Sequence, residues 1–176
     1  MHFFEYYTKN FVKYDLLNKF QYKKISQIPK LNKIILSYEF KKYDFRLLLS
    51  ALIALELITL QKCSIIRAKV SNISLKVRKG NPIGCKVILR KKLMNLFFFK
   101  LLNELLIKIQ KFNLNFDKKE SKTFSFKVKN SLIFTELENN YQFFKNLPGL
   151  NIIIITNATN YNDLKLLLKL YKIISN

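Results

Sequence analysis

The sequence is poor in the residues that build tight turns and reactive sites. Its 176 residues include three glycines, three prolines, two cysteines, one histidine and eleven acidic residues. His2 stands at the terminus, so it cannot anchor a catalytic triad. The acidic residues are mostly scattered among lysines and form no converging set of ionisable groups for hydrolytic or metal chemistry. We therefore predict that the protein is not an enzyme and has no cofactor.

The two cysteines exclude two further kinds of site. Cys63 and Cys85 form neither a CxxC pair nor a His/Cys cluster, and a single pair at this spacing makes neither a zinc site nor a disulfide framework. We expect both to pack as small apolar side chains.

Long apolar runs are lacking as well. The most membrane-like segment, LLLSALIALELITL at 47–60, has 14 residues and contains Glu56. A spanning helix needs roughly 18 or more apolar residues, so a buried helix is predicted. The first 17 residues resemble neither a secretory signal nor a transit peptide. If the protein works in an organelle, we expect it to be made there.

Positive charge is what the sequence has in abundance. Lysine and arginine total 32 against 11 acidic residues, a formal net charge of +21. A compact domain with this charge repels itself, which indicates a polyanionic partner, either nucleic acid or an anionic membrane. In the membrane alternative, the lysines would bind anionic lipid and the 47–60 helix would act as an anchor of a peripheral protein.

The charge is concentrated in the middle of the chain. No acidic residue lies between Glu56 and Glu104. The basic residues of this acid-free stretch are Lys62, Arg67, Lys69, Lys76, Arg78, Lys79, Lys86, Arg90, Lys91, Lys92 and Lys100. A polyanion could approach this stretch without repulsion.

Hydrophobic periodicity predicts one α+β domain over 1–176. Helices are expected at 3–20, 43–60, 91–112 and 161–174, and strands at 33–38, 64–70, 85–90, 123–129, 131–136 and 151–156. The expected architecture is a mostly antiparallel sheet of about five strands with helices packed on one face and a projecting basic loop. Consecutive Phe97, Phe98 and Phe99 could suggest a base-stacking platform, but helical geometry spreads them around the axis, and core packing is favoured.

Two of the three glycines lie in RKGNPIGCKVILR, residues 78–90. Gly80 and Gly84 permit positive φ or a close backbone approach, and Pro82 stiffens the turn between them. This pattern predicts a basic loop with a rigid tip, although an ordinary hairpin turn would fit it equally well.

The same stretch resembles the signature R-x-G-x-P-I-G-C-K-V-T-L-R of the large-subunit ribosomal protein L-five family (universal large-subunit protein five). Further ordered matches are FQYKKISQIPKLNKIIL at 20–36, LITLQKCSIIRAK at 57–69, LIFTE at 132–136 and LPGLNIIIITNATNYNDLKLLL at 147–168. The resemblance covers most of the chain.

This resemblance implies a structural, non-catalytic role in the ribosomal central protuberance. The implied partners are large-subunit rRNA, 5S rRNA where present, the P-site tRNA and neighbouring ribosomal proteins including one of the small-subunit head, with no membrane as primary partner. The implied rRNA-binding residues are Gln61, Lys62, Arg67, Lys69, Lys86, Arg90, Lys91 and Lys92. The implied tRNA-facing loop, at about 71–84, contains Asn72, Lys76, Arg78, Lys79, Gly80, Asn81, Pro82 and Gly84.

Three departures from the family bear on 5S rRNA. The family has Asn, Phe and Thr where this chain has Ser37, Leu75 and Ile88. Those family residues contribute to 5S rRNA recognition together with the glutamine matched by Gln61. Because Ile88 cannot form a side-chain hydrogen bond and Leu75 cannot stack as a ring does, we hypothesise that 5S rRNA contact is altered or that 5S rRNA is absent from the particle.

The remaining composition indicates an AT-rich genome, since lysine outnumbers arginine 28 to 4 and Phe, Tyr, Ile and Asn abound. Together with the expected site of synthesis, this predicts an organelle-encoded protein of a mitochondrial ribosome. A plastid or a bacterial cytoplasm are the alternatives.

Overall fold

The structure is a computed structural model that describes residues 2–40, 44–108 and 122–171. The chain forms two compact units. The first comprises residues 1–34, 90–125 and 153–176, and the second comprises 35–89 and 126–152. The boundaries at 34/35, 125/126 and 152/153 fall inside strands. The expectation of one domain over 1–176 stays a prediction.

A five-stranded antiparallel sheet with order β2-β3-β1-β5-β4 confirms the predicted α+β class. The strands are β1 (Leu31–Glu39), β2 (Ser64–Arg67), β3 (Pro82–Leu89), β4 (Thr123–Val128) and β5 (Leu150–Thr156). Burial alternates along β4 and β5, as the two faces of a strand require.

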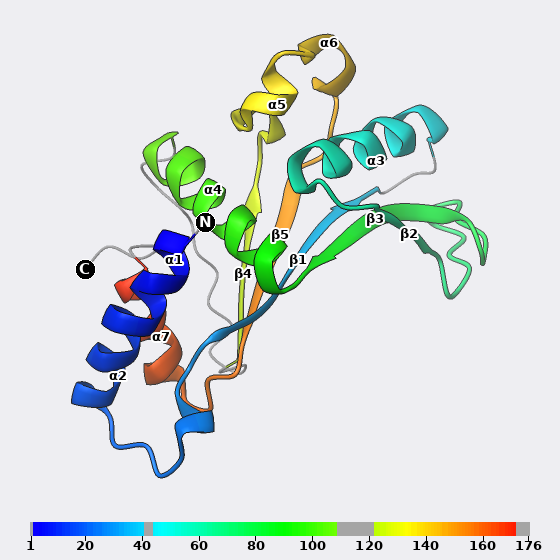
Figure 1. Cartoon of the computed structure of the whole chain (residues 1–176). Helices are drawn as coiled ribbons and strands as arrows, with labels where there is room; N and C mark the ends of the chain where they lie inside the picture. The colour runs from blue at the N-terminus through cyan, green and yellow to red at the C-terminus, as the bar shows by residue number, and fades with distance from the viewer. Residues whose placement is uncertain (1, 41–43, 109–121, 172–176) are drawn as a thin grey trace. The chain divides into compact units, whose positions relative to one another are not determined.

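The helices are α1 (His2–Tyr7), α2 (Lys13–Lys19), α3 (Phe45–Thr59), α4 (Lys91–Lys108), α5 (Thr135–Glu138), α6 (Tyr141–Phe144) and α7 (Tyr161–Leu170). A π-helical segment (Thr8–Val12) joins α1 to α2, and short 3₁₀ turns lie at Ile25–Gln27 and Ser131–Ile133. Figure 1 shows the order of these elements.

In the second unit, α3 packs against β3, and α5 and α6 pack against α3. Asp44 is the N-cap of α3, and its carboxylate accepts a hydrogen bond from the Arg46 backbone N–H at 2.9 Å. Leu60 is the C-cap, with a φ of 54°. The helix predicted at 43–60 is therefore present, but Leu49 and Ile53 are exposed, so only one face is buried.

In the first unit, α1 contacts α4 and α2 contacts α7. An aromatic cluster holds this unit together: the ring centroid of Phe98 lies 5.2 Å from those of both Phe4 and Tyr171. Phe97 and Phe98 are buried, which confirms core packing for two members of the phenylalanine triple, whereas Phe99 is 44% exposed.

The first helix departs from its predicted face. The helical spacing of Phe4, Tyr7, Phe11, Tyr14 and Leu17 predicts that they share one apolar face. Phe4 is buried, but Phe11, Tyr14 and Leu17 are exposed, and Leu16 is buried instead. The π-helical segment adds a residue to one turn and shifts the phase of the residues that follow it.

The prediction of a strand at 131–136 is wrong. Residues 131–133 form a 3₁₀ turn and α5 begins at Thr135. The Asn130 side chain accepts a hydrogen bond from the Leu132 backbone N–H at 3.0 Å, so local turn chemistry prevails over the short apolar run. The part of the predicted 91–112 helix after residue 108 lies outside the described residues.

Candidate nucleic-acid interface

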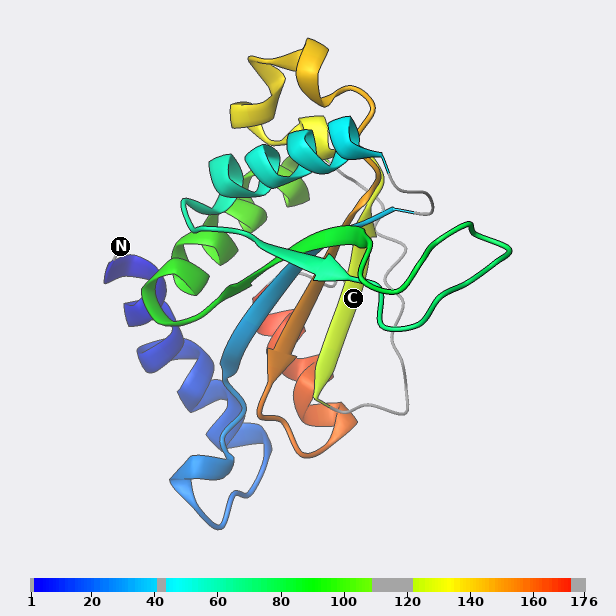
Figure 2. The same cartoon turned by 90° about the vertical axis from the view of Figure 1, so that its right-hand side faces the viewer.

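The acid-free stretch contains an antiparallel hairpin, which we call the arm: β2, the loop 68–81 and β3. The strands pair Ser64 with Lys86 and Ile66 with Gly84, with a bulge between Ile66 and Arg67. The arm lies within the second unit, and its loop extends beyond the ends of both strands (Figure 2).

Backbone hydrogen bonds close the loop at two levels. At its base, the Ala68 N–H donates to the Asn81 carbonyl at 2.9 Å and the Gly80 N–H donates to the Ala68 carbonyl at 2.9 Å. Nearer the tip, Asn72 and Val77 exchange hydrogen bonds of 2.8 and 3.0 Å. The loop is therefore an ordered element rather than an open coil.

Side-chain hydrogen bonds shape the tip. The Asn72 carboxamide oxygen accepts from the Ser74 hydroxyl at 2.6 Å and from the Leu75 backbone N–H at 3.4 Å. Such a bond from an asparagine to its own turn is a common turn-forming device. Lys76 completes the turn with a φ of 53°.

The two glycines serve different purposes. Gly80 has a φ of 91°, a conformation that favours glycine, at the base of the loop. Gly84 lies inside β3, where a Cβ atom would collide with the backbone carbonyl of Tyr38. Both expected reasons for glycine thus occur, one at each position.

The start of β3 corrects the predicted limits of the loop. Pro82, Ile83 and Gly84 belong to β3, which begins three residues earlier than the predicted 85–90 strand. Proline is tolerated as the first residue of a strand because it needs to donate no ladder hydrogen bond there. Pro82 and Gly84, expected in the tRNA-facing loop, are therefore strand residues, whereas Asn72, Lys76, Arg78, Lys79, Gly80 and Asn81 lie in the loop.

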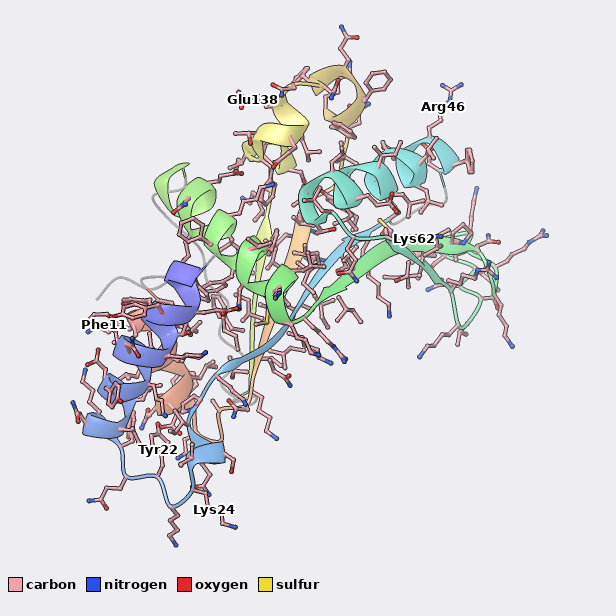
Figure 3. All side chains as sticks on the ribbon, viewed as in Figure 1. Phe11, Tyr22, Lys24, Arg46, Lys62 and Glu138 are labelled. Atoms are coloured by element: carbon pink, nitrogen blue, oxygen red, sulfur yellow. The ribbon has the colours of Figure 1, made fainter. Side chains whose placement is uncertain are left out.

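The predicted cationic residues are all exposed to solvent. Within the second unit these are Lys62, Arg67, Lys69, Lys76, Arg78, Lys79 and Lys86. Figure 3 shows long side chains extending outward around the arm, with Lys62 labelled near its base. The arm therefore presents positive charge on a hydrogen-bonded frame, which suits contact with phosphates.

Arg90, Lys91 and Lys92 are also exposed but belong to the first unit, at the start of α4. Lys91 has a φ of 50°. The structure thus brings the predicted rRNA-binding residues together in two groups, with Gln61 half-buried at the end of α3.

The residues that depart from the family occupy distinct environments. Ser37 is buried in β1, with 7% of its surface exposed. Leu75 is 46% exposed at the tip of the loop, and Ile88 is half-buried in β3. Only Leu75 among these three presents a largely accessible side chain.

Sequence reasoning missed the exposed apolar residues of the loop. Ile73 is 95% exposed and Val70 is 77% exposed. The segment SNIS, with its asparagine and serines, signals a turn that would place Ile73 outward. Cys63 was also expected to be packed and is instead partly exposed, whereas Cys85 is buried as expected.

No group of three or more potential metal ligands occurs within residues 2–40, 44–108 and 122–171. Over the same ranges, no helix has the length and apolar character to cross a membrane.

Comparison with known proteins supplies the family. Residues 82–174 match the sequence model of the ribosomal L-five family C-terminus. The large ribosomal subunit protein uL5 of Wigglesworthia glossinidia brevipalpis is 41% identical over 164 residues, which cover 90% of this chain and 89% of that protein. The corresponding protein of Blochmanniella floridana is 36% identical over 94% of this chain and 88% of its own.

A mitochondrial relative is similar over the same extent. The large ribosomal subunit protein uL5m of Reclinomonas americana is 34% identical over 170 residues, covering 92% of this chain and 91% of that protein. These relatives are structural ribosomal proteins and not enzymes. From the family match and from relatives that span nearly the whole chain, we conclude that this chain belongs to the uL5 family of large-subunit ribosomal proteins.

Proposed function

We propose that this chain binds large-subunit rRNA in the central protuberance and presents the loop of the arm toward the P-site tRNA. One observation carries the proposal: an ordered hairpin in the acid-free stretch exposes every one of its lysines and arginines. Family membership supplies the ribosome as the setting.

The charge supports phosphate contact. Each phosphate that a lysine or arginine neutralises releases condensed counterions, which favours binding and makes it depend on salt. The loop carries Lys69, Lys76, Arg78 and Lys79 without an acidic neighbour. Contacts of this kind position the RNA and do not read its bases.

The order of the loop supports the same proposal. A flexible loop loses conformational entropy when it binds, whereas the paired Asn72 and Val77 and the Asn72 side-chain bonds already restrict this one. The fixed tip lets several cations meet a phosphate chain together.

The experiment compares two variants with equal charge loss. In the loop variant, Lys76→Gln, Arg78→Gln and Lys79→Gln are combined; in the control, Lys9→Gln, Lys165→Gln and Lys169→Gln are combined on exposed helical positions. Filter binding to large-subunit rRNA transcribed from the same genome gives log Kobs against log salt concentration. We expect the slope of the loop variant to be shallower by about two to three and that of the control by less than about one.

Equal slopes for the two variants would contradict the proposal, because the binding would then follow net charge rather than the arm. A parallel measurement with anionic phospholipid vesicles tests the membrane alternative. Vesicle binding that persists after nuclease treatment, with no measurable affinity for the rRNA, would favour that alternative.

We further propose that contact with 5S rRNA is altered in this chain or that 5S rRNA is absent from its particle. Leu75 lacks the ring and Ile88 lacks the hydroxyl that the family presents. Combining Leu75→Phe and Ile88→Thr should strengthen binding to a bacterial 5S rRNA transcript by about tenfold, since one stacked base contributes about 1–3 kcal/mol. Ile73→Phe, on the neighbouring exposed position, is the control. A wild-type chain that binds this transcript as tightly as the double variant would contradict the proposal.

We also propose a mitochondrial ribosome as the site of action, with the small-subunit head as a further contact. A residue composition typical of an AT-rich genome and the mitochondrial relative support it, whereas the other two relatives named above are bacterial. Sedimentation of the tagged chain with large subunits from purified mitochondria is the expected result, and its recovery from another compartment alone would contradict it.

A further inference from the structure

The two cysteines of the chain meet at the base of the arm. Cys63 immediately precedes β2 and Cys85 lies in β3. Because Ile65 pairs with Cys85, Cys63 lies on the same face one diagonal position away. The two side chains are close enough for each thiol to affect the pKa of the other. The Cys63 sulfur also lies 3.4 Å from the backbone carbonyl oxygen of Lys86, the residue after Cys85.

The two thiols differ in exposure and in acidity. Cys63 is partly exposed and Cys85 is fully buried. The hydrogen bond from Cys85 lowers the pKa of the Cys63 thiol, against the opposing effects of partial burial and the Glu56 carboxylate. The same hydrogen bond, followed by burial, raises the pKa of the Cys85 thiol. A partly exposed thiol of lowered pKa beside a buried thiol of raised pKa is the arrangement of an attacking and a resolving cysteine.

We propose that Cys63 is a thiol-modification site that reacts with small disulfides of the glutathione type and that Cys85 resolves the adduct. In the first step, the Cys63 thiolate attacks oxidised glutathione; a Cys63–glutathione bond forms, the glutathione S–S bond breaks and one glutathione thiolate leaves. In the second step, Cys85 gives up its proton and attacks the Cys63 sulfur, and a second glutathione thiolate leaves. The protein loses two electrons and two protons, and one oxidised glutathione becomes two reduced molecules.

The backbone around Cys63 permits the small movement that a covalent bond requires. Diagonal neighbours on adjacent strands lie somewhat farther apart than the Cβ atoms of a disulfide. Cys63 lies before Ser64, the first paired residue of β2, so it can move without breaking the ladder. The Cys63 backbone N–H donates a hydrogen bond of 3.0 Å to the Glu56 carboxylate, and this contact would change when Cys63 moves.

The site would tie the segment between α3 and the arm to β3. The bond would link Cys63 to the strand that leads out of the basic loop. This inference is independent of the proposed RNA contacts, because it concerns the chemistry of the free chain and its test uses no nucleic acid.

The test treats the full-length reduced chain with oxidised glutathione and measures intact mass and peptide maps. Wild type should end as a Cys63–Cys85 disulfide, two hydrogens lighter and without attached glutathione. Cys85→Ala should accumulate one glutathione on Cys63, and Cys63→Ser should take up none. Far-UV circular dichroism checks that both variants are folded.

Three results would overturn the proposal: a lasting glutathione adduct on Cys63 of the wild type, uptake by Cys63→Ser, or two free thiols in the wild type where a model peptide thiol reacts. The wild-type peptide map decides the question by itself if a variant fails to fold.

Discussion

The arm and the aromatic cluster of the first unit are held in opposite ways. The arm is fixed by backbone pairing and by the Asn72 turn, and its long side chains face the solvent. The cluster is fixed by the burial of Phe4, Phe98 and Tyr171, of which Phe98 is fully buried. Backbone hydrogen bonds stabilise the arm, so its charged side chains stay free to bind a partner. In the cluster, the side chains themselves stabilise the fold by packing.

This difference separates binding from folding. Substitutions of loop cations remove charge without removing packing, and substitutions in the cluster remove packing without removing charge. The loop variants should therefore change RNA binding, and the cluster variants should change the free energy of unfolding. A variant that changes both quantities would contradict this separation.

The largest stability effect should come from the cluster. Phe98→Ala should lower the free energy of unfolding by about 3–5 kcal/mol, because a fully buried ring leaves a cavity. Urea unfolding followed by circular dichroism measures the change. Phe99→Ala, on a half-exposed ring of the same helix, is the control and should cost about 1 kcal/mol or less. Equal losses for the two variants would show that the ring of Phe98 is not the centre of the packing.

A smaller effect is expected at the glycine inside the arm. Gly84→Ala should destabilise the chain by about 1–3 kcal/mol, because the new Cβ would press on the backbone carbonyl of Tyr38 and the strands would have to separate. The midpoint of thermal unfolding reports this change. The new Cβ of Gly80→Ala would meet no atom within 4 Å, so this variant should lower the free energy of unfolding by about 1 kcal/mol from its positive φ alone. A Gly84→Ala chain as stable as wild type would contradict the close approach of β1 and β3.

The smallest stability effect should come from the loop cations. The combined Lys76→Gln, Arg78→Gln and Lys79→Gln variant should unfold within about 0.5 kcal/mol of wild type, because all three side chains are exposed. Urea titration of this chain beside wild type checks it. A loss as large as that of Phe98→Ala would mean that these cations help to hold the fold and would undo the separation between the two regions.

The sequence predicted the arm better than it predicted the helices. Gly80, Gly84 and the lysine-rich flanks indicated the hairpin, because glycine positions and charge runs are local signals. The prediction of a turn at the tip between these glycines is wrong: Gly80 lies at the base of the loop and Gly84 lies inside β3, and the Asn72 side chain shapes the tip. The beginning of β3 at Pro82 was missed, since a proline at the first residue of a strand resembles one in a turn.

Elsewhere, local backbone geometry and strand register made the predictions from hydrophobic periodicity wrong or incomplete. The π-helical segment at Thr8–Val12 shifted the buried face from Phe11 and Tyr14 to Leu16, and no pattern in the sequence announced it. The meeting of Cys63 with Cys85 depends on the register between β2 and β3, which sequence spacing alone does not fix. The exposure of Leu49 and Ile53 on α3 could not be predicted, because the run is apolar on all sides and has no periodicity that separates a buried face from an exposed one.

The central claim is that the cationic arm lies against folded RNA in the ribosome. An electron cryo-microscopy map of the native large subunit that contains this chain tests it most directly. The account predicts that the side chains of Lys76, Arg78 and Lys79 point at the site of the P-site tRNA and that Lys62, Arg67 and Lys86 contact sugar–phosphate backbone. An arm that faces only solvent or protein in that map, with no RNA backbone within reach of these cations, would contradict the account.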